Sequence, residues 1–165
     1  MIEKIDLSKI HIVREIAQIT WPVAFGEILS KEQLAYMMNM MYSVEVLEKQ
    51  LNEGHEFYLF YENEFPLGFM GLELNYKKSN QVKIHKLYIL PENQGKGIGE
   101  KLIDFASNRC KEENLEILTL NVNRFNKALT FYEKLGFKNV KSEDIEIGNG
   151  YLMEDFVMEK KVNEE

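Results

Sequence analysis

The chain of 165 residues has few of the features that mark secreted or membrane-embedded proteins. Its single cysteine, Cys110, cannot form a disulfide within the chain, which favours a reducing compartment such as the cytoplasm. No apolar run approaches the roughly 20 residues that a membrane-spanning helix needs. The first residues, Met1 to Asp6, are charged and lack the apolar stretch of a signal peptide. We therefore expect a cytoplasmic protein that does not enter a membrane.

Proline is also scarce, with only Pro22, Pro66 and Pro91, and the sequence has no repeat, low-complexity tract or linker-like stretch. The apolar share of 45% and the charged share of 28% are typical of a soluble globular protein. A chain of this length can bury one good core. We expect a single domain over residues 1–165. The oligomeric state is left open between a monomer and a homodimer.

An excess of positive charge is absent as well, because the formal net charge is −7. This argues against nucleic acid as a partner. The charge is uneven: residues 81–138 contain ten lysines and arginines against seven acidic residues, so the acidic excess lies elsewhere. A basic segment suits phosphates, and an acidic remainder suits a cationic acceptor, although each of these side chains could simply be solvated.

The glycines concentrate where an apolar run meets a helical pattern. Residues 87–90 read as the end of a strand, Pro91 opens a turn, and Gly95, Gly97 and Gly99 precede an amphipathic stretch at 100–105. A strand, a glycine turn and a helix direct backbone N–H groups and the positive end of a helix dipole at one place. This arrangement favours binding of a phosphorylated cofactor.

Three glycine patterns and one structural alternative compete for this segment. The mononucleotide loop needs a Lys-Ser/Thr pair that is missing, and the dinucleotide fingerprint needs a third glycine where Glu100 stands. The pattern Q/R-x-x-G-x-G/A is matched at every defined position by residues 94–99. An ordinary tight turn between a strand and a helix is the alternative without a ligand.

A second block, at residues 117–137, carries the resemblance to a known family. An alternating strand at 117–123 is followed by a helix over 126–135, with Asn126 as its N-cap and Gly136 after its end. Together with the glycine pattern, the spacing Asn126, Ala128, Phe131-Tyr132, Gly136-Phe137 resembles the GNAT superfamily of N-acetyltransferases. The likeness is firm over about 81–137. More loosely, the chain resembles the PaiA-type polyamine acetyltransferases, through Phe25, a helix with Leu34 and Tyr36-Met37, and an ending with Gly148, Asp155 and Met158.

Periodicity predicts an α+β fold. Helices are expected over 8–20, 30–41 (after a capping box at Ser30), 43–52, 97–113 and 126–135, and strands over 2–5, 56–61, 66–75, 81–90, 117–123, 138–147 and 151–160. The polar connectors at 62–64 and 77–80 predict that the strands at 56–61, 66–75 and 81–90 are antiparallel neighbours. The resemblance implies a GNAT-type mixed, mostly antiparallel sheet of about seven strands flanked by helices. It also implies that the two central strands, at 87–90 and 118–123, splay apart.

The resemblance further implies acetyl-CoA as co-substrate, with no metal ion. Main-chain groups at Leu87 and Ile89 would pair with the pantetheine arm, and the amides of the glycine loop would hold the pyrophosphate. The residues expected to bind the cofactor are Leu87, Ile89, Gln94, Gly95, Lys96, Gly97, Ile98, Gly99, Asn126 and Lys134.

Tyr132 and His85 are the candidate catalytic residues. By resemblance, Tyr132 is the general acid that protonates the leaving thiolate; the alternative is a core aromatic residue. His85 lies two residues before Leu87, so in a strand both side chains project to the same face. It titrates in the range of a general base. Lys83 departs from the histidine pair of related enzymes, so a structural histidine or a water path remains an alternative.

The acceptor site is expected near the connector at residues 21–27, with Phe25, Glu27 and Tyr42 as substrate contacts, although aromatic residues here could equally be core. The sequence thus predicts an acetyl-CoA-dependent N-acetyltransferase acting on a small-molecule primary amine, of which a polyamine is one candidate. The alternatives are an acetyltransferase of protein or peptide amines, a non-catalytic acyl-CoA-binding module, and a nucleotide-binding protein.

Overall fold

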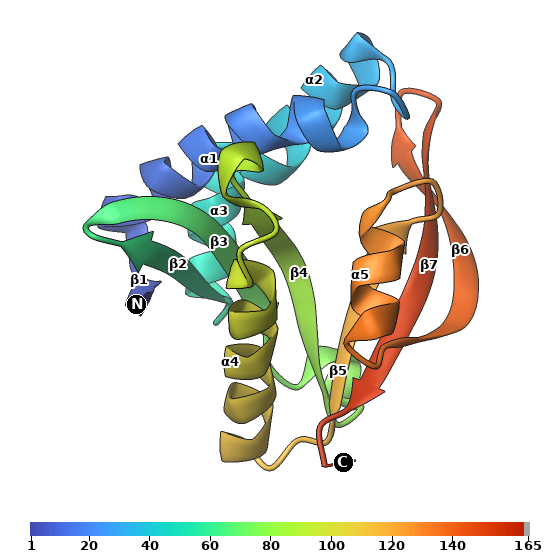
Figure 1. The fold of residues 1–165 in the computed structure, drawn as a ribbon. Helices are drawn as coiled ribbons and strands as arrows, with labels where there is room; N and C mark the ends of the chain where they lie inside the picture. Colours follow the sequence, from blue (N-terminus) through green and yellow to red (C-terminus); the bar gives the residue numbers. More distant parts are fainter. Residues whose placement is uncertain (164–165) are drawn as a thin grey trace.

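Seven strands form one sheet in the computed structural model, which describes residues 1–163 (Figure 1). Their order across the sheet is β1-β2-β3-β4-β5-β7-β6, and every neighbouring pair is antiparallel except β4 with β5. The mixed, mostly antiparallel sheet is therefore confirmed. The strands are β1 (Ile2–Ile5), β2 (Glu56–Glu62), β3 (Phe65–Glu73), β4 (Gln81–Ile89), β5 (Ile117–Asn123), β6 (Lys138–Gly148) and β7 (Tyr151–Lys161).

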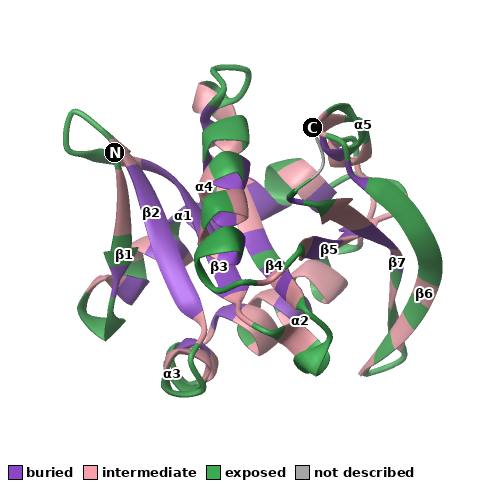
Figure 2. Cartoon of the chain, turned by 90° about the horizontal axis from the view of Figure 1, so that it is seen from below, coloured by how far each residue is buried: buried purple, intermediate pink, exposed green. Residues whose placement is uncertain are grey.

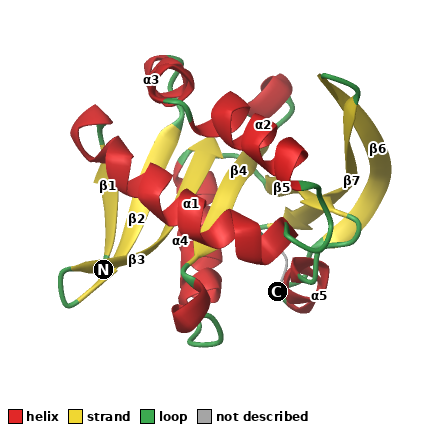
Figure 3. Ribbon diagram, turned by 90° about the horizontal axis from the view of Figure 1, so that it is seen from above, coloured by secondary structure: helices red, strands yellow, loops and turns green. Residues whose placement is uncertain are grey.

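Within residues 1–163, five α-helices flank this sheet, with α1 and α2 crossing one face and α4 lying on the other (Figures 1 and 3). Ser30 and Ser43 cap α2 and α3, because each hydroxyl accepts a bond from the N–H three residues on. The capping box is only half formed, since the amide of Gln33 donates to the Leu152 carbonyl instead of returning to Ser30. The helices are α1 (Ile10–Phe25), α2 (Lys31–Tyr42), α3 (Val44–Asn52), α4 (Ile98–Glu112) and α5 (Ala128–Lys134).

Helix α1 is longer than the sequence predicts. It was expected to end near Thr20, with residues 21–27 as a connector, but it continues to Phe25 with Pro22 inside it. Proline cannot donate to the carbonyl one turn back and normally ends or kinks a helix. Here Trp21 and Phe25 are both buried in the core, and their packing holds the last turn in place. Only Gly26 and Glu27 of the predicted connector lie outside α1.

Two apolar clusters pack on the two faces of the sheet. One contains Leu102 and Ile103 of α4 with Leu118 and Leu120 of β5, and the other contains residues of α1 to α3 with Phe57 and Phe69. Figure 2 shows the buried residues gathered in β2, β3 and the inner side of α4, while β6 is largely exposed. Within the described range, none of the helices is both long and apolar enough to cross a membrane.

The sheet opens between its two parallel strands. β4 pairs with β5 only from Gln81 opposite Ile117 to Ile84 opposite Leu120, although both strands continue beyond this point. Figure 1 shows the two strands together at one end and apart at the other. The predicted splay between the central strands is therefore confirmed. The candidate functional site lies in this opening.

Candidate functional site

A cleft of about 1050 Å³ occupies the split between β4 and β5. It is bounded by the end of α1, the glycine loop, the end of β5 and the start of α5. Most of the residues that the sequence singled out line it, although they come from five different segments. They are Phe25, Glu27, His85, Leu87, Ile89, Gln94, Gly95, Gly97, Ile98, Gly99, Asn126 and Tyr132.

The main chain of β4 directs backbone polar groups that have no partner on β5 toward this cleft. Leu90 donates its N–H to the Leu67 carbonyl, at 2.9 Å. Every second residue of β4, counted back from Leu90, therefore bonds to β3. In an antiparallel pair, residues alternate between bonding to that partner and facing away from it. Leu87 and Ile89 therefore direct their N–H and C=O groups to the side of β5, where the pairing has already ended at Ile84.

The glycine loop forms a second row of free donors. Among the described residues, the backbone N–H groups of positions 95–100 have no intramolecular partner, and the first bond of α4 runs from Lys101 to Gly97. Gly95 and Gly97 both have φ of +79°, a conformation that L side chains rarely adopt. Six unpaired donors at the N-terminus of a helix form an anion site.

The third glycine and the glutamine have local structural roles. A Cβ on Gly99 would lie 2.9 Å from the ring of Phe131, so this glycine lets α5 approach α4 closely. The side-chain amide of Gln94 donates to the carbonyl of Ile89, at 3.3 Å. That bond ties the start of the loop to the end of β4.

Tyr132 lies at the wall of the cleft on α5 and is 9% exposed. Burial raises the pKa of its phenol well above the usual range, so the hydroxyl keeps its proton at neutral pH. Asn126 is not the N-cap that the sequence predicts, because α5 begins at Ala128 and Lys127 occupies the cap position. The Asn126 side chain still accepts a bond from the N–H of Ala128, at 2.9 Å.

Sequence reasoning missed Tyr88, which also lines the cleft. Its ring packs against Trp21, Phe25 and Phe69. Burial raises the pKa of its phenol, and the nearby Tyr132 and Asp155 raise this pKa further. Two protonated phenols therefore lie near one another at the split. The available signal was the position of this tyrosine between Leu87 and Ile89, within the strand already assigned to the cofactor.

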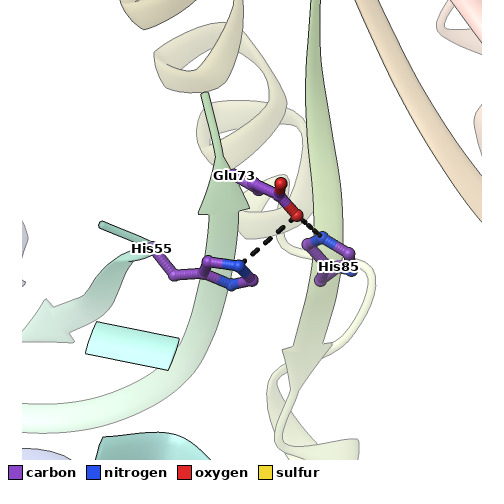
Figure 4. Close-up of side chains that lie close together, drawn as sticks. All are labelled: His55, Glu73 and His85. Atoms are coloured by element: carbon purple, nitrogen blue, oxygen red, sulfur yellow. Dashed lines mark hydrogen bonds and ion pairs between the residues drawn. The ribbon is translucent and has the colours of Figure 1, made fainter. Parts of the chain in front are cut away.

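His85 does not share a face with Leu87, so this prediction is wrong. A β-bulge shifts the register between β3 and β4: Gly71 pairs with Lys86 and Leu72 pairs with Ile84, which leaves His85 as the extra residue. The bulge breaks the two-residue alternation. Leu87 packs in the cluster under α4, whereas the His85 imidazole contacts Glu73, with Nε2 2.8 Å from the carboxylate (Figure 4).

Charges around His85 act in opposite directions. Burial lowers the pKa of His85, and the cationic Lys83 and Lys86 lower it further, whereas the Glu73 carboxylate favours the protonated ring. An ionised carboxylate can only accept, so Nε2 carries the proton in this bond. Lys86 is itself buried, which lowers its pKa to about 8, and its ammonium donates to the Gln50 side chain at 3.0 Å.

Three predicted site residues lie outside the cleft. Lys134 is exposed on α5, and Lys96 lines a separate hollow of about 700 Å³ together with Lys101. Tyr42 is 3% exposed and packs edge-on against Trp21 and Phe69. Burial raises the pKa of Tyr42, and it occupies the core position that the sequence left as the alternative.

Known acetyltransferases resemble the chain in both sequence and structure. A family model described as an acetyltransferase (GNAT) domain matches residues 27–160. A spermidine N(1)-acetyltransferase of Thermoplasma acidophilum is 28% identical over 166 residues, which cover 97% of this chain and 96% of that protein. A crystal structure of the PaiA N-acetyltransferase of T. acidophilum, in complex with coenzyme A, has a TM-score of 0.82 at 27% identity and covers 98% of both chains.

A GCN5-related N-acetyltransferase of Rhodopseudomonas palustris also shares the fold. Its TM-score is 0.82 at 19% identity, and the match covers 98% of this chain and 94% of that one. The chain belongs to the GNAT family of acetyltransferases. It is an enzyme of the N-acetyltransferase class.

Proposed function

We propose that this enzyme transfers the acetyl group of acetyl-CoA to the primary amine of a small molecule. The observation that carries this proposal is that two segments at the split, the glycine loop and the end of β4, direct backbone polar groups into the cleft. The loop N–H groups of residues 95–100 suit a diphosphate, and the free edge of β4 at Leu87 and Ile89 suits an extended arm with amide groups. The complex of the T. acidophilum PaiA enzyme with coenzyme A supports the assignment.

The residues of the cleft fit a direct transfer. A backbone N–H of β4 at the split polarises the thioester carbonyl. The amine nitrogen bonds to the carbonyl carbon, the carbon–sulfur bond breaks, and the sulfur leaves as a thiolate. Tyr132 then gives its phenolic proton to that thiolate, and the phenolate regains a proton from solvent. The amine loses its proton to water or to His85, the two routes that the sequence left open.

A polyamine is the acceptor that we favour. The relative from T. acidophilum is named a spermidine N(1)-acetyltransferase, and most of this chain's negative charge lies outside the basic cofactor segment. Glu27 is exposed just beyond α1 and lines the cleft beside the buried Phe25. A carboxylate and an aromatic ring at the mouth of a cleft suit an alkyl chain with ammonium groups. The cytoplasmic location stays a prediction.

Two measurements test the proposal in order. Isothermal titration calorimetry with coenzyme A should show saturable binding at one site per chain. Steady-state assays with acetyl-CoA should then show turnover with spermidine and spermine that exceeds turnover with amino acids and with peptide N-termini. Binding without turnover of any amine would indicate an acyl-CoA-binding module. Turnover restricted to peptides would overturn the small-molecule assignment, and absence of binding would overturn the whole proposal.

A further inference from the structure

Three side chains converge next to the bulge in β4 (Figure 4), and His85 is the one among them that the proposed acetyl transfer names, as an alternative to water for taking the amine proton. His55 follows the end of α3, Glu73 ends β3, and His85 is the bulge residue. The Glu73 oxygen Oε1 lies 2.8 Å from Nε2 of His85 and 3.4 Å from Nε2 of His55. The two imidazole rings stack with 5.1 Å between their centroids. One carboxylate oxygen of Glu73 therefore lies close to a nitrogen of each imidazole.

We propose that His55, Glu73 and His85 form a binding site for a divalent transition metal ion of the zinc class. Two imidazoles and one carboxylate are a common ligand set for Zn²⁺. One ligand atom from each residue lies within 4.8 Å of the other two. In tetrahedral coordination, metal–ligand bonds of about 2.0–2.2 Å hold the ligand atoms about 3.3–3.5 Å apart. The His55–Glu73 distance of 3.4 Å lies within this range and the His85–Glu73 distance of 2.8 Å lies below it, so small side-chain rotations suffice, and water would complete the coordination.

The fold brings these ligands together in a way that the spacing of the residues does not suggest. The bulge separates the face of His85 from that of Leu87, so the imidazole lies on the side of Glu73 while Leu87 packs in the cluster under α4. The N–H of His55 donates to the carbonyl of Gln50 at 2.9 Å, which anchors this residue to the last turn of α3. The side chains of His55, His85 and Glu73 are 10%, 25% and 34% exposed, so an ion can reach them from solvent.

Charges on both sides of the cluster set its affinity. Glu73, Glu53 and the C-terminal end of α3 favour a cation, whereas the ammonium groups of Lys83 and Lys86 oppose one. We therefore expect a site weaker than a closed structural zinc site. The reaction proposed above needs no ion here, because its donors are the glycine loop, β4 and Tyr132.

Zinc titration of the chelator-treated full chain, followed by calorimetry, tests the site. We expect one Zn²⁺ per chain, and we expect Glu73→Gln and His85→Ala each to weaken binding by about tenfold or more. The chain offers a matched control in His11→Ala, because His11 is the third histidine and lies exposed on α1. Zinc affinity should be unchanged in this control. Equal loss in all three variants, or no saturable binding to the unmodified chain, would overturn the proposal.

Two further measurements separate loss of the metal site from loss of folding: the absorption spectrum of bound Co²⁺, and zinc binding by a variant that is expected to bind more tightly. Co²⁺ bound to the unmodified chain should show visible d–d absorption typical of a tetrahedral nitrogen and oxygen set, and His55→Ala should abolish it. Lys83→Met should tighten zinc binding, because it removes a cation that acts on His85. Weaker binding in Lys83→Met, or an unchanged cobalt spectrum in His55→Ala, would contradict the site. Coenzyme A binding, measured in parallel, reports whether each variant is folded.

Discussion

Two tyrosine side chains at the split, Tyr132 and Tyr88, are protonated and line the cleft. Tyr132 of α5 is buried and Tyr88 of β4 is half-buried. Desolvation raises the pKa of both phenols, so both remain protonated at neutral pH. A protonated phenol can donate to a thiolate. Phe131, which precedes Tyr132, contacts Gly99 at the start of α4. The position of the phenol therefore depends on one glycine in another helix.

Tyr132→Phe should lower kcat for amine acetylation by about 10²-fold or more, because it removes the proton donor for the leaving thiolate. The ring remains, so the affinity for coenzyme A, measured by calorimetry, should stay the same. Tyr88→Phe is the matched control, since it removes a phenolic hydroxyl elsewhere in the same cleft. An equal loss in both variants would remove the acid role from Tyr132.

Gly99→Ala should lower kcat by about 10- to 100-fold, because the new Cβ pushes Phe131 and with it the adjacent Tyr132 out of place. The steady-state assay measures this change. Adding Phe131→Leu to Gly99→Ala should recover part of the lost rate, since a smaller side chain relieves the contact. Full activity in Gly99→Ala alone would refute the role assigned to this glycine.

At the scale of elements, α4 is fixed to the sheet at both ends. Its N-terminus emerges from the glycine loop, and near its C-terminus Arg109 holds Glu56 of β2 by two bonds, Nε to Oε1 at 2.9 Å and Nη2 to Oε2 at 2.8 Å. The Glu56 side chain is 7% exposed, and Tyr58 donates a further bond to it. A buried carboxylate with three donors orients α4 and thereby directs its first turn at the cleft.

Arg109→Met should lower the free energy of unfolding by about 3–5 kcal/mol, because it leaves the buried Glu56 carboxylate with only the exposed Lys4 ammonium, 3.5 Å away, as a cation. Urea unfolding measures this loss. The double variant Arg109→Met with Glu56→Met should regain most of the stability, since no unpaired charge is left. A loss below about 1 kcal/mol in the single variant would show that solvent screens the ion pair between Arg109 and Glu56.

The same pair predicts an acid dependence of stability. Burial alone would raise the pKa of Glu56, but the bonds from Arg109 and Tyr58 outweigh it and lower this pKa to about 2, from a usual 4.5. A depressed pKa contributes stability above pH 4.5, and this contribution is lost as the pH falls toward 2. The loss amounts to about 3 kcal/mol. Glu56→Gln should flatten this part of the curve of unfolding free energy against pH, and an unchanged slope would contradict the assignment.

At the scale of the whole molecule, the split divides the sheet into two parts that other contacts hold together. The Tyr36 hydroxyl of α2 donates to the Ile147 carbonyl of β6 at 2.5 Å, and Gln33 donates to the Leu152 carbonyl of β7 at 3.0 Å. These bonds join α2 to the hairpin formed by β6 and β7, and Figure 1 shows the tip of this hairpin beside one end of α2. A ligand lying in the cleft would join the same two parts from inside.

Coenzyme A at 100 times its dissociation constant should therefore raise the free energy of unfolding by about 2.7 kcal/mol and raise the melting temperature. Differential scanning fluorimetry across a concentration series measures the shift. NAD is the matched control, because its pyrophosphate could occupy the glycine loop although it has no pantetheine arm to pair with β4. An equal shift with NAD would favour the nucleotide-binding alternative.

The periodicity of the chain was enough to predict each strand and each α-helix of the described residues, although not the short 3₁₀ helices, because hydrophobic spacing reflects which side of each element is buried. Several local predictions needed correction, and three of them depend on partners distant in sequence. Pro22 predicts a helix end, but the burial of Trp21 and Phe25 extends α1 past it. Alternation places His85 with Leu87, but a bulge against β3 separates them. Tyr42 looks like a substrate contact, but it packs in the core under α1.

The order of apolar and polar residues, the glycines at 95, 97 and 99, and the block from Asn126 to Phe137 determined the family, the elements and most of the cleft lining. These features are local, since backbone conformation at a glycine and the periodicity of an element depend on neighbours in the chain. Only the tertiary structure decided where β4 leaves β5, which way His85 turns, and that Tyr88 lies near Tyr132. These outcomes depend on pairing register and on packing between segments tens of residues apart, which no local pattern specifies.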